Sequence, residues 1–211
     1  MKKNNTILAA IFILFVNFTY GQRPKDIKNS EVKGIFLTHA DFKQNRLICS
    51  SNNQNKAVKI KLNQFFISPE ISCFELQKHS VFHKDSIFAI HLSNGTNYRF
   101  INRNPCLIAD TSFLFIYTYN TIKTEYKQSG PTRRAKKIPV TYYYFSSGQN
   151  KEVYSLTISN LCKYLHIESD IKAAINQKYK SDEMLYSMNQ KTGHFIINEF
   201  LIELTQKSSK D

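Results

Sequence analysis

The sequence predicts an α+β fold with a sheet-rich, mainly antiparallel body followed by C-terminal helices. Residues 32–148 hold several runs of aromatic and β-branched residues separated by turn residues, a pattern typical of strands. Residues 155–207 instead repeat apolar residues at intervals of three and four, which is the spacing of amphipathic helices. An order of many strands and then several helices indicates the α+β class. We expect one domain over residues 32–207.

Residues 1–21 have the layout of a secretory signal peptide. Two lysines precede an uninterrupted apolar run at residues 7–16, and small residues precede a cleavage point after Gly21. Asn17 ends the run well before the roughly 20 apolar residues that a spanning helix needs. We therefore expect cleavage, export to the periplasm or the cell surface or exterior, a polar leader at residues 22–31, and no transmembrane segment in the mature chain. An uncleaved membrane anchor is the alternative.

The first elements of the domain are a strand and a short helix. Residues 32–37 predict the strand, and Thr38 is a suitable helix cap. Asp41 favours a helix start because its charge complements the helix dipole, and the helix should end near Asn45. Residues 57–62 alternate apolar residues with lysine, which predicts a half-buried strand.

A β-hairpin is predicted around Asn94-Gly95. These two residue types tolerate the positive φ angles of a two-residue type I′ turn. Counting back from such a turn pairs His91 with Tyr98. Both faces of the hairpin then carry aromatic or branched side chains, so we expect a sheet that is covered on both sides, at least in part.

Two further strands are predicted at residues 113–119 and 141–145, with a long polar loop between them. Helical spacing follows at residues 158–165 and 171–179, then a short helix and a last helix through Leu204. The candidate N-caps of these helices are Thr157 or Ser159, Ser169 or Asp170, Ser181 and Asn198, in chain order.

Positive charge is the strongest compositional bias. The formal net charge is +13, and subtracting the two lysines of the signal peptide leaves +11. The charge gathers in the predicted loop at residues 120–139, where Glu125 is the single acidic residue. Such a cluster attracts polyanions, which predicts contact with an anionic envelope component or protein partner. The alternative is a solvated hairpin tip that maintains solubility. The candidate anion-binding residues are Lys123, Lys127, Arg133, Arg134, Lys136 and Lys137.

We expect no nucleic-acid partner, because Tyr126 is the one aromatic residue among the basic residues of this loop. We also expect no cofactor, no metal site and no catalytic residue that local motifs identify. His79 and His83 are four residues apart, and in an extended chain that spacing separates them by about 13 Å. The chain holds neither a zinc-protease helix motif, a serine-hydrolase elbow nor a phosphate-binding glycine loop.

The four cysteines allow two interpretations. In an oxidising compartment they form up to two disulfides, or all four are small buried hydrophobic residues. They are Cys49, Cys73, Cys106 and Cys162.

Several short motifs lie between about residues 32 and 165. They are Gly34-Ile35-Phe36-Leu37-Thr38 with Asp41-Phe42, Lys84-Asp85-Ser86-Ile87-Phe88-Ala89, Tyr98-Arg99-Phe100, Tyr143-Tyr144-Phe145-Ser146, and Leu156-Thr157-Ile158 with Asn160-Leu161. In these motifs the chain resembles a family of exported bacterial proteins of unassigned function. None of the motifs is catalytic, so the resemblance implies export but no substrate, cofactor or partner.

The sequence therefore favours a non-catalytic exported protein with a basic loop for anionic surfaces or partners. One alternative is an envelope hydrolase whose site is assembled from scattered positions, for example His91, Asp85 and Arg99. Another is an accessory subunit of an envelope complex, which would expose an apolar patch of several hundred Å².

Overall fold

The computed structural model describes residues 31–48, 58–59, 69–75, 78–129, 132–147, 152–165 and 168–208. The predicted signal peptide, and the polar leader except for Glu31, lie outside these residues. The helices are α2 (His39–Lys43), α3 (Ile158–Tyr164), α4 (Ser169–Lys178), the 3₁₀ helix η2 (Asp182–Tyr186) and α5 (Ile196–Ser208). None of the described helices combines the length and the apolar character that crossing a membrane requires.

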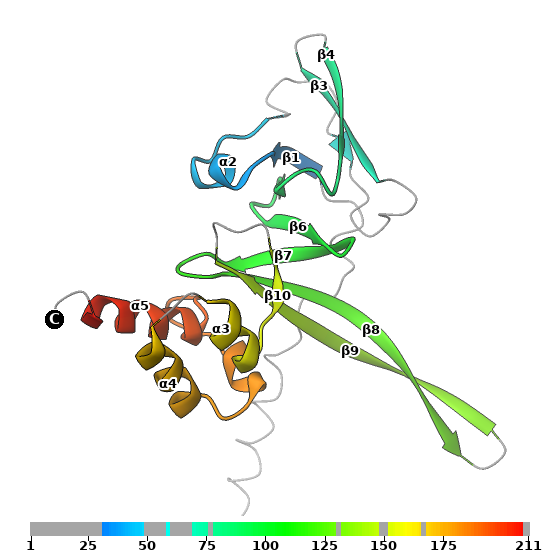
Figure 1. The fold of residues 1–211 in the computed structure, drawn as a ribbon. Helices are drawn as coiled ribbons and strands as arrows, with labels where there is room; N and C mark the ends of the chain where they lie inside the picture. The colour runs from blue at the N-terminus through cyan, green and yellow to red at the C-terminus, as the bar shows by residue number, and fades with distance from the viewer. Residues whose placement is uncertain are drawn as a thin grey trace, which may run out of the picture.

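In the described part of the chain, ten strands form an eight-stranded sheet and a separate two-stranded sheet (Figure 1). The large sheet has the order β10-β9-β8-β7-β6-β5-β1-β2, β3 pairs with β4, and every pairing is antiparallel. The predicted fold class is confirmed. The strands are β1 (Glu31–Phe36), β2 (Val58–Lys59), β3 (Glu70–Glu75), β4 (Lys78–His83), β5 (Ala89–Leu92), β6 (Asn97–Ile101), β7 (Asn104–Asp110), β8 (Phe115–Ser129), β9 (Thr132–Ser146) and β10 (Tyr154–Ser155).

The predicted cap of the first helix is confirmed. The Thr38 hydroxyl accepts a hydrogen bond from the Asp41 amide at 3.1 Å, and the Asp41 carboxylate accepts one from the Thr38 amide at 3.0 Å. This reciprocal capping box satisfies two amides that the first turn would otherwise leave without partners. The helix is thereby fixed directly after β1.

The hairpin around Gly95 forms, but its predicted register is wrong by one residue. His91 pairs with Asn97 and Ile90 with Tyr98. Gly95 donates to the Leu92 carbonyl at 3.0 Å and has a φ of 83°, while Leu92 donates to the Thr96 carbonyl. The connection is therefore a turn followed by a glycine bulge, which uses Gly95 one position later than a two-residue turn would.

A two-residue turn with positive φ occurs instead between β6 and β7. Its central residues, Asn102 and Arg103, have φ angles of 49° and 65°, and Ile101 pairs with Asn104 across it. Both angles meet the requirement of a type I′ turn. Asparagine is common in this conformation, whereas a residue such as arginine is rare in it.

The prediction of a long polar loop between residues 119 and 141 is wrong. β8 and β9 each continue for 15 residues, and their register runs without a break from Phe115 opposite Ser146 to Ser129 opposite Thr132. Threonine, isoleucine, valine and tyrosine recur between the charged residues of this segment, and these types favour strands. The segment is a two-stranded β-ribbon. Its form therefore agrees with the hairpin that the sequence offered as the alternative to an anion-binding loop.

The helical region forms as predicted, with different caps at two helices, and Ser181 stands at the N-cap of η2 without a side-chain cap bond. Thr157 caps α3 by accepting from the Asn160 amide at 3.1 Å. Glu168 stands at the N-cap of α4 without a side-chain bond, so neither Ser169 nor Asp170 caps that helix. The last helix begins at Ile196, two residues before the predicted cap Asn198.

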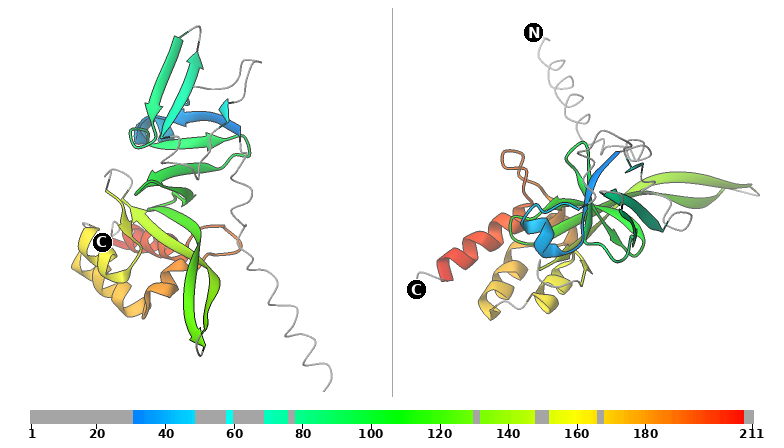
Figure 2. Two further views of the ribbon diagram at one scale, coloured as in Figure 1. Left: turned by 90° about the vertical axis from the view of Figure 1, so that its right-hand side faces the viewer. Right: turned by 90° about the horizontal axis from the view of Figure 1, so that it is seen from above.

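Apolar layers cover part of both faces of the large sheet, as the hairpin pattern predicts. On one face, Ile116 and Phe145 pack against the C-terminal helices through Leu161, Ile175 and Leu201. These helices gather beside β9 and β10, at the opposite end of the molecule from β3 and β4 (Figure 2). The other face holds a second apolar cluster of Ile101, Cys106, Phe115 and Tyr117, to which Phe42 of α2 and Phe88 contribute.

The strained turn at Arg103 gives a stability prediction. Replacing Arg103 with glycine should raise the free energy of unfolding by about 1 kcal/mol relative to Arg103→Ala, because only glycine removes the left-handed penalty of the Cβ atom. Urea denaturation of both variants measures the difference. Equal stability of the two variants would contradict strain at this position.

Candidate functional site

The ribbon of β8 and β9 leaves the body of the molecule where its neighbouring strands end. β7 pairs with β8 only as far as Thr118, and β10 pairs with β9 only as far as Tyr144. Beyond these pairs the described residues place no third strand beside the ribbon, and it projects away from the helices (Figure 1). We call residues 119–129 and 132–142 the distal ribbon. At about 3.3 Å per residue the distal ribbon extends roughly 30 Å.

All six candidate anion-binding residues lie on the distal ribbon. Lys123 and Lys127 are on β8, and the other four are on β9. The register places Lys123 and Lys136 on one face and pairs Lys127 with Arg134. Lys137, opposite Thr124, is on the other face, and Arg133 pairs with Gln128. The structure thus brings together residues that are up to fourteen positions apart in sequence.

The acidic residue Glu125 offsets little of this charge. Its carboxylate lies 4.0 Å from the Lys123 ammonium, and both side chains are exposed. Glu125 also stands opposite Lys136 in the register. One carboxylate cannot balance six cations, so the distal ribbon keeps a net positive charge.

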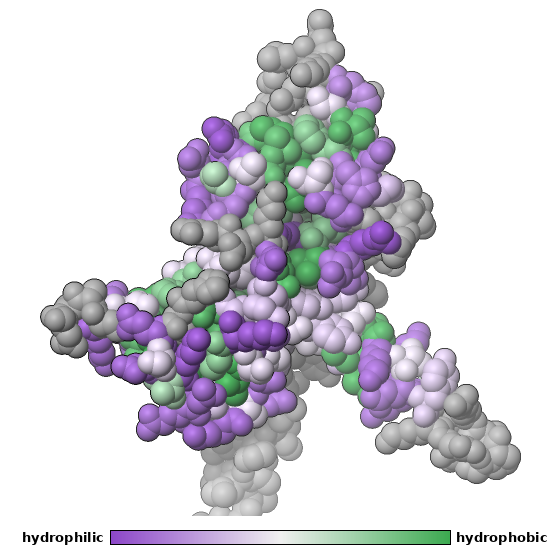
Figure 3. All heavy atoms as spheres, in the orientation of Figure 1, coloured by the Kyte–Doolittle hydropathy of each residue, from purple (hydrophilic) through white to green (hydrophobic). Residues whose placement is uncertain are grey.

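Exposed apolar side chains lie on the same ribbon. Ile122 is 58% exposed, Tyr126 64% and Tyr142 44%. Ile122 is opposite Pro139 and Tyr126 is opposite Ala135, so these four residues share one face, and we call them the apolar row. Tyr142 is on the other face, where its ring stacks on Tyr119 with 6.4 Å between centroids. Figure 3 shows hydrophilic atoms along the projecting ribbon with hydrophobic atoms among them.

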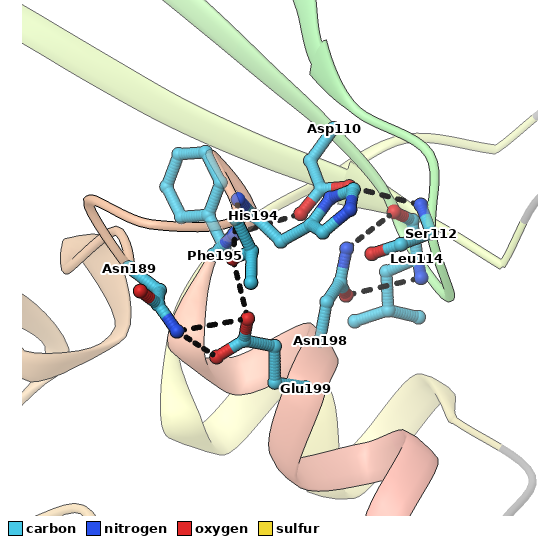
Figure 4. A network of polar contacts seen from close by, with 9 residues as sticks. Asp110, Ser112, Leu114, Asn189, His194, Phe195, Asn198 and Glu199 are labelled. Atoms are coloured by element: carbon cyan, nitrogen blue, oxygen red, sulfur yellow. Dashed lines mark hydrogen bonds and ion pairs between the residues drawn. The ribbon is translucent and has the colours of Figure 1, made fainter.

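A second cluster of polar residues joins the sheet to the C-terminal helices (Figure 4). The Asp110 side chain is fully buried and accepts from the Phe195 amide at 2.8 Å and the Ser112 amide at 2.9 Å. The same carboxylate lies 3.1 Å from Nδ1 of His194, whose side chain is 47% exposed. Asn198, also buried, accepts from the Leu114 amide and donates to the Leu114 carbonyl, each at 3.0 Å.

The pKa values of the two carboxylates in this cluster are shifted in the same direction. Burial by itself would raise the pKa of Asp110, but hydrogen bonds from Ser112, Phe195 and Asn198 outweigh burial and hold it below its usual 3.8. Hydrogen bonds from Thr192 and Asn189 lower the pKa of Glu199. Both groups are therefore held in the charged form.

The polar cluster resembles half of a catalytic site, since a buried aspartate orients a half-exposed histidine. No described hydrogen bond joins the His194 ring to a nucleophilic side chain. The Ser112 hydroxyl bonds to Asp110, and the Thr192 hydroxyl donates to Glu199 at 2.5 Å, so both hydroxyls are engaged with carboxylates. The arrangement suits a structural connection between sheet and helices. No local sequence pattern indicates this cluster, because its members lie 84 and 85 positions apart.

The residues suggested for a hydrolase do not form one site through the contacts that the structure describes. His91 Nδ1 lies 2.7 Å from Asn97 Oδ1, and Arg99 donates to the Tyr117 hydroxyl at 2.9 Å. Asp85 is in the turn after β4, 3.6 Å from Nδ1 of His83. Each residue thus contacts a different partner.

His79 and His83 lie on strand β4, the extended conformation that the sequence indicates. The described part of the chain groups no three potential metal ligands. Cys106 and Cys162 are free thiols, and burial raises the pKa of Cys106 to about 12, so it behaves as a buried hydrophobic residue. Cys49 and the side chain of Cys73 lie outside the described residues.

Comparison of the chain with protein-family models, with curated proteins and with solved structures finds no match. Function is therefore inferred from the chemistry of the described residues.

Removal of the Asn198 side chain should destabilise the fold. Asn198→Ala leaves the buried amide and carbonyl of Leu114 without partners, which we expect to lower the free energy of unfolding by about 2–4 kcal/mol. Asn176 is an exposed asparagine on α4, and Asn176→Ala should stay within about 0.5 kcal/mol of the wild type. Chemical denaturation followed by circular dichroism measures both variants. A value for Asn198→Ala as small as that of the control would contradict the role of the amide.

Asp110 should make stability depend on acid pH. Because its pKa is lower in the folded than in the unfolded chain, it stabilises the fold above the unfolded pKa. That stabilisation is lost as the pH falls through the folded pKa, below about pH 4. The free energy of unfolding of Asp110→Asn should therefore fall less between pH 5 and pH 2 than that of the wild type. Glu203→Gln, an exposed change on α5, is the matched control. Parallel pH profiles for wild type and Asp110→Asn would count against this linkage.

Proposed function

We propose that the protein is a non-catalytic, exported binding protein whose distal ribbon docks on an anionic surface of the cell envelope. The observation that carries the proposal is the concentration of six basic residues on a ribbon that projects beyond its neighbouring strands. The lysines and apolar run of residues 1–21 support the export part of the proposal.

The position of the charge suits contact with an extended surface. Electrostatic attraction in physiological salt decays over about 8–10 Å. A ribbon that extends roughly 30 Å from the sheet therefore meets a charged surface before the body of the molecule does. The attraction guides association, because it acts before any close contact forms.

The secondary structure of the distal ribbon adds support. Two strands without a covering layer or a third strand are marginally stable in water. Cross-strand contacts such as the hydrogen bond from the Thr141 hydroxyl to Asn120 at 2.7 Å, and the stack of Tyr119 on Tyr142, hold the ribbon together. Docking on a surface would add contacts along its length.

Neutralising the ribbon tests the proposal. Replacing Arg133, Arg134, Lys136 and Lys137 together with glutamine should reduce affinity for heparin and for anionic vesicles by about tenfold or more at about 0.1 M salt. Elution from a heparin column and vesicle co-sedimentation measure the effect.

The matched control removes the same charge elsewhere. Lys163, Lys180, Lys191 and Lys207 are exposed in the helical part of the chain, and their joint replacement with glutamine should leave both affinities close to wild type. An equal loss in the two variants would show that net charge, and not the ribbon, governs binding. Unchanged binding of the ribbon variant would overturn the proposal.

A further inference from the structure

The exposed apolar side chains are unevenly distributed. Among the described residues, the exposed large hydrophobic side chains are Val81, Ile122, Tyr126, Tyr142, Met184 and Met188. Half of them lie on the distal ribbon, the part of the molecule with the most concentrated positive charge. Solubility alone does not explain this combination, because exposed isoleucine and tyrosine side chains reduce solubility.

The apolar row and the basic residues are arranged in a regular pattern. Ile122 and Tyr126 share a face with Lys137, which stands opposite Thr124 between them. Lys123 and Lys136 occupy the other face, within one strand position of the apolar row. Long lysine side chains can reach around a narrow two-stranded ribbon while their ammonium groups stay in a polar layer. The distal ribbon therefore offers apolar and cationic groups to one surface at the same time.

An anionic lipid bilayer matches both groups. Its headgroup layer supplies phosphates, and the boundary with the acyl chains lies a few ångströms deeper, where tyrosine is favoured. A soluble polyanion would neutralise the lysines but leave Ile122 and Tyr126 in water. A second copy of the chain is disfavoured, because two ribbons of equal positive charge repel each other.

We infer that the surface recognised by the distal ribbon is an anionic lipid bilayer, into whose headgroup layer Ile122 and Tyr126 insert. This inference rests on the proposed function and specifies the surface. The basic residues of the ribbon attract the bilayer, and the apolar row then holds the ribbon on it.

The absence of tryptophan from the chain allows a direct test. Tyr126→Trp creates a single tryptophan in the apolar row, and Tyr142→Trp creates one on the opposite face of the ribbon. The probes are vesicles of phosphatidylcholine with about a third phosphatidylglycerol, vesicles of phosphatidylcholine alone, and heparin. We expect the Tyr126→Trp emission to shift to shorter wavelength with the anionic vesicles and to be quenched by lipids with brominated acyl chains. Tyr142→Trp should change much less.

A second variant separates insertion from charge. Ile122→Ser with Tyr126→Ser leaves the net charge unchanged, so it should bind heparin like the wild type. Its affinity for the anionic vesicles should fall by about tenfold, because the apolar contact is lost. Circular dichroism checks that each variant is folded.

The outcomes distinguish the two proposals. Vesicle binding without a shift of Tyr126→Trp, or equal vesicle binding of the serine variant and the wild type, overturns insertion but leaves anionic docking intact. Binding to heparin without binding to vesicles also overturns the inference of a lipid bilayer and leaves the proposal of anionic docking intact. Loss of binding to every anionic probe overturns both proposals. If sedimentation shows dimers that form through the ribbon, the partner of the ribbon is a second copy of the chain and the inference of a bilayer is overturned.

Discussion

The attachment of the C-terminal helices to the sheet depends on two buried polar side chains, Asp110 and Asn198 (Figure 4). The segment between β7 and β8 leaves the sheet ladder, so its backbone groups need other partners. Asn198 satisfies both the amide and the carbonyl of Leu114, and Asp110 accepts the amide of Phe195 at the start of α5. Apolar packing tolerates small shifts, but buried hydrogen bonds do not, because an unpaired buried group is costly. These bonds therefore select one position for the helices on the sheet.

That position divides the ribbon into two parts with different surroundings. At its base, Ile116 and Phe145 pack under the helices, while Phe115 and Tyr117 pack on the opposite face. Tyr119 still packs against the second of these clusters, and beyond it the described strands carry lysine, threonine and exposed apolar side chains instead. The covered base holds the strands rigidly in the sheet. The uncovered part is available for contact with other molecules, and its charge and shape favour an extended anionic surface.

A histidine that lies against a buried carboxylate does not by itself indicate a catalytic site. His194 lies against a buried carboxylate, yet the neighbouring hydroxyls of Ser112 and Thr192 bond to Asp110 and Glu199. Asp110 and Asn198 connect the sheet side to the C-terminal helices, while Asn189, Thr192 and Glu199 bond to one another beside α5. On the distal ribbon the strands pair through backbone hydrogen bonds, and Lys123 makes an exposed ion pair with Glu125. Function is therefore better sought on the ribbon.

The sequence by itself determined the α+β class with strands before helices, the cap at Thr38, and which residues carry the positive charge, because local spacing and side-chain chemistry control these features. It did not determine that residues 119–142 form a ribbon, since charged residues obscure a strand pattern that only cross-strand pairing stabilises. It also assigned Asn198 to a helix cap, whereas the folded chain uses that amide for Leu114, 84 residues away. The hairpin register was decided by the turn geometry at Gly95. Tertiary structure decided these points because each one depends on a partner that is distant in sequence or on backbone geometry that composition does not specify.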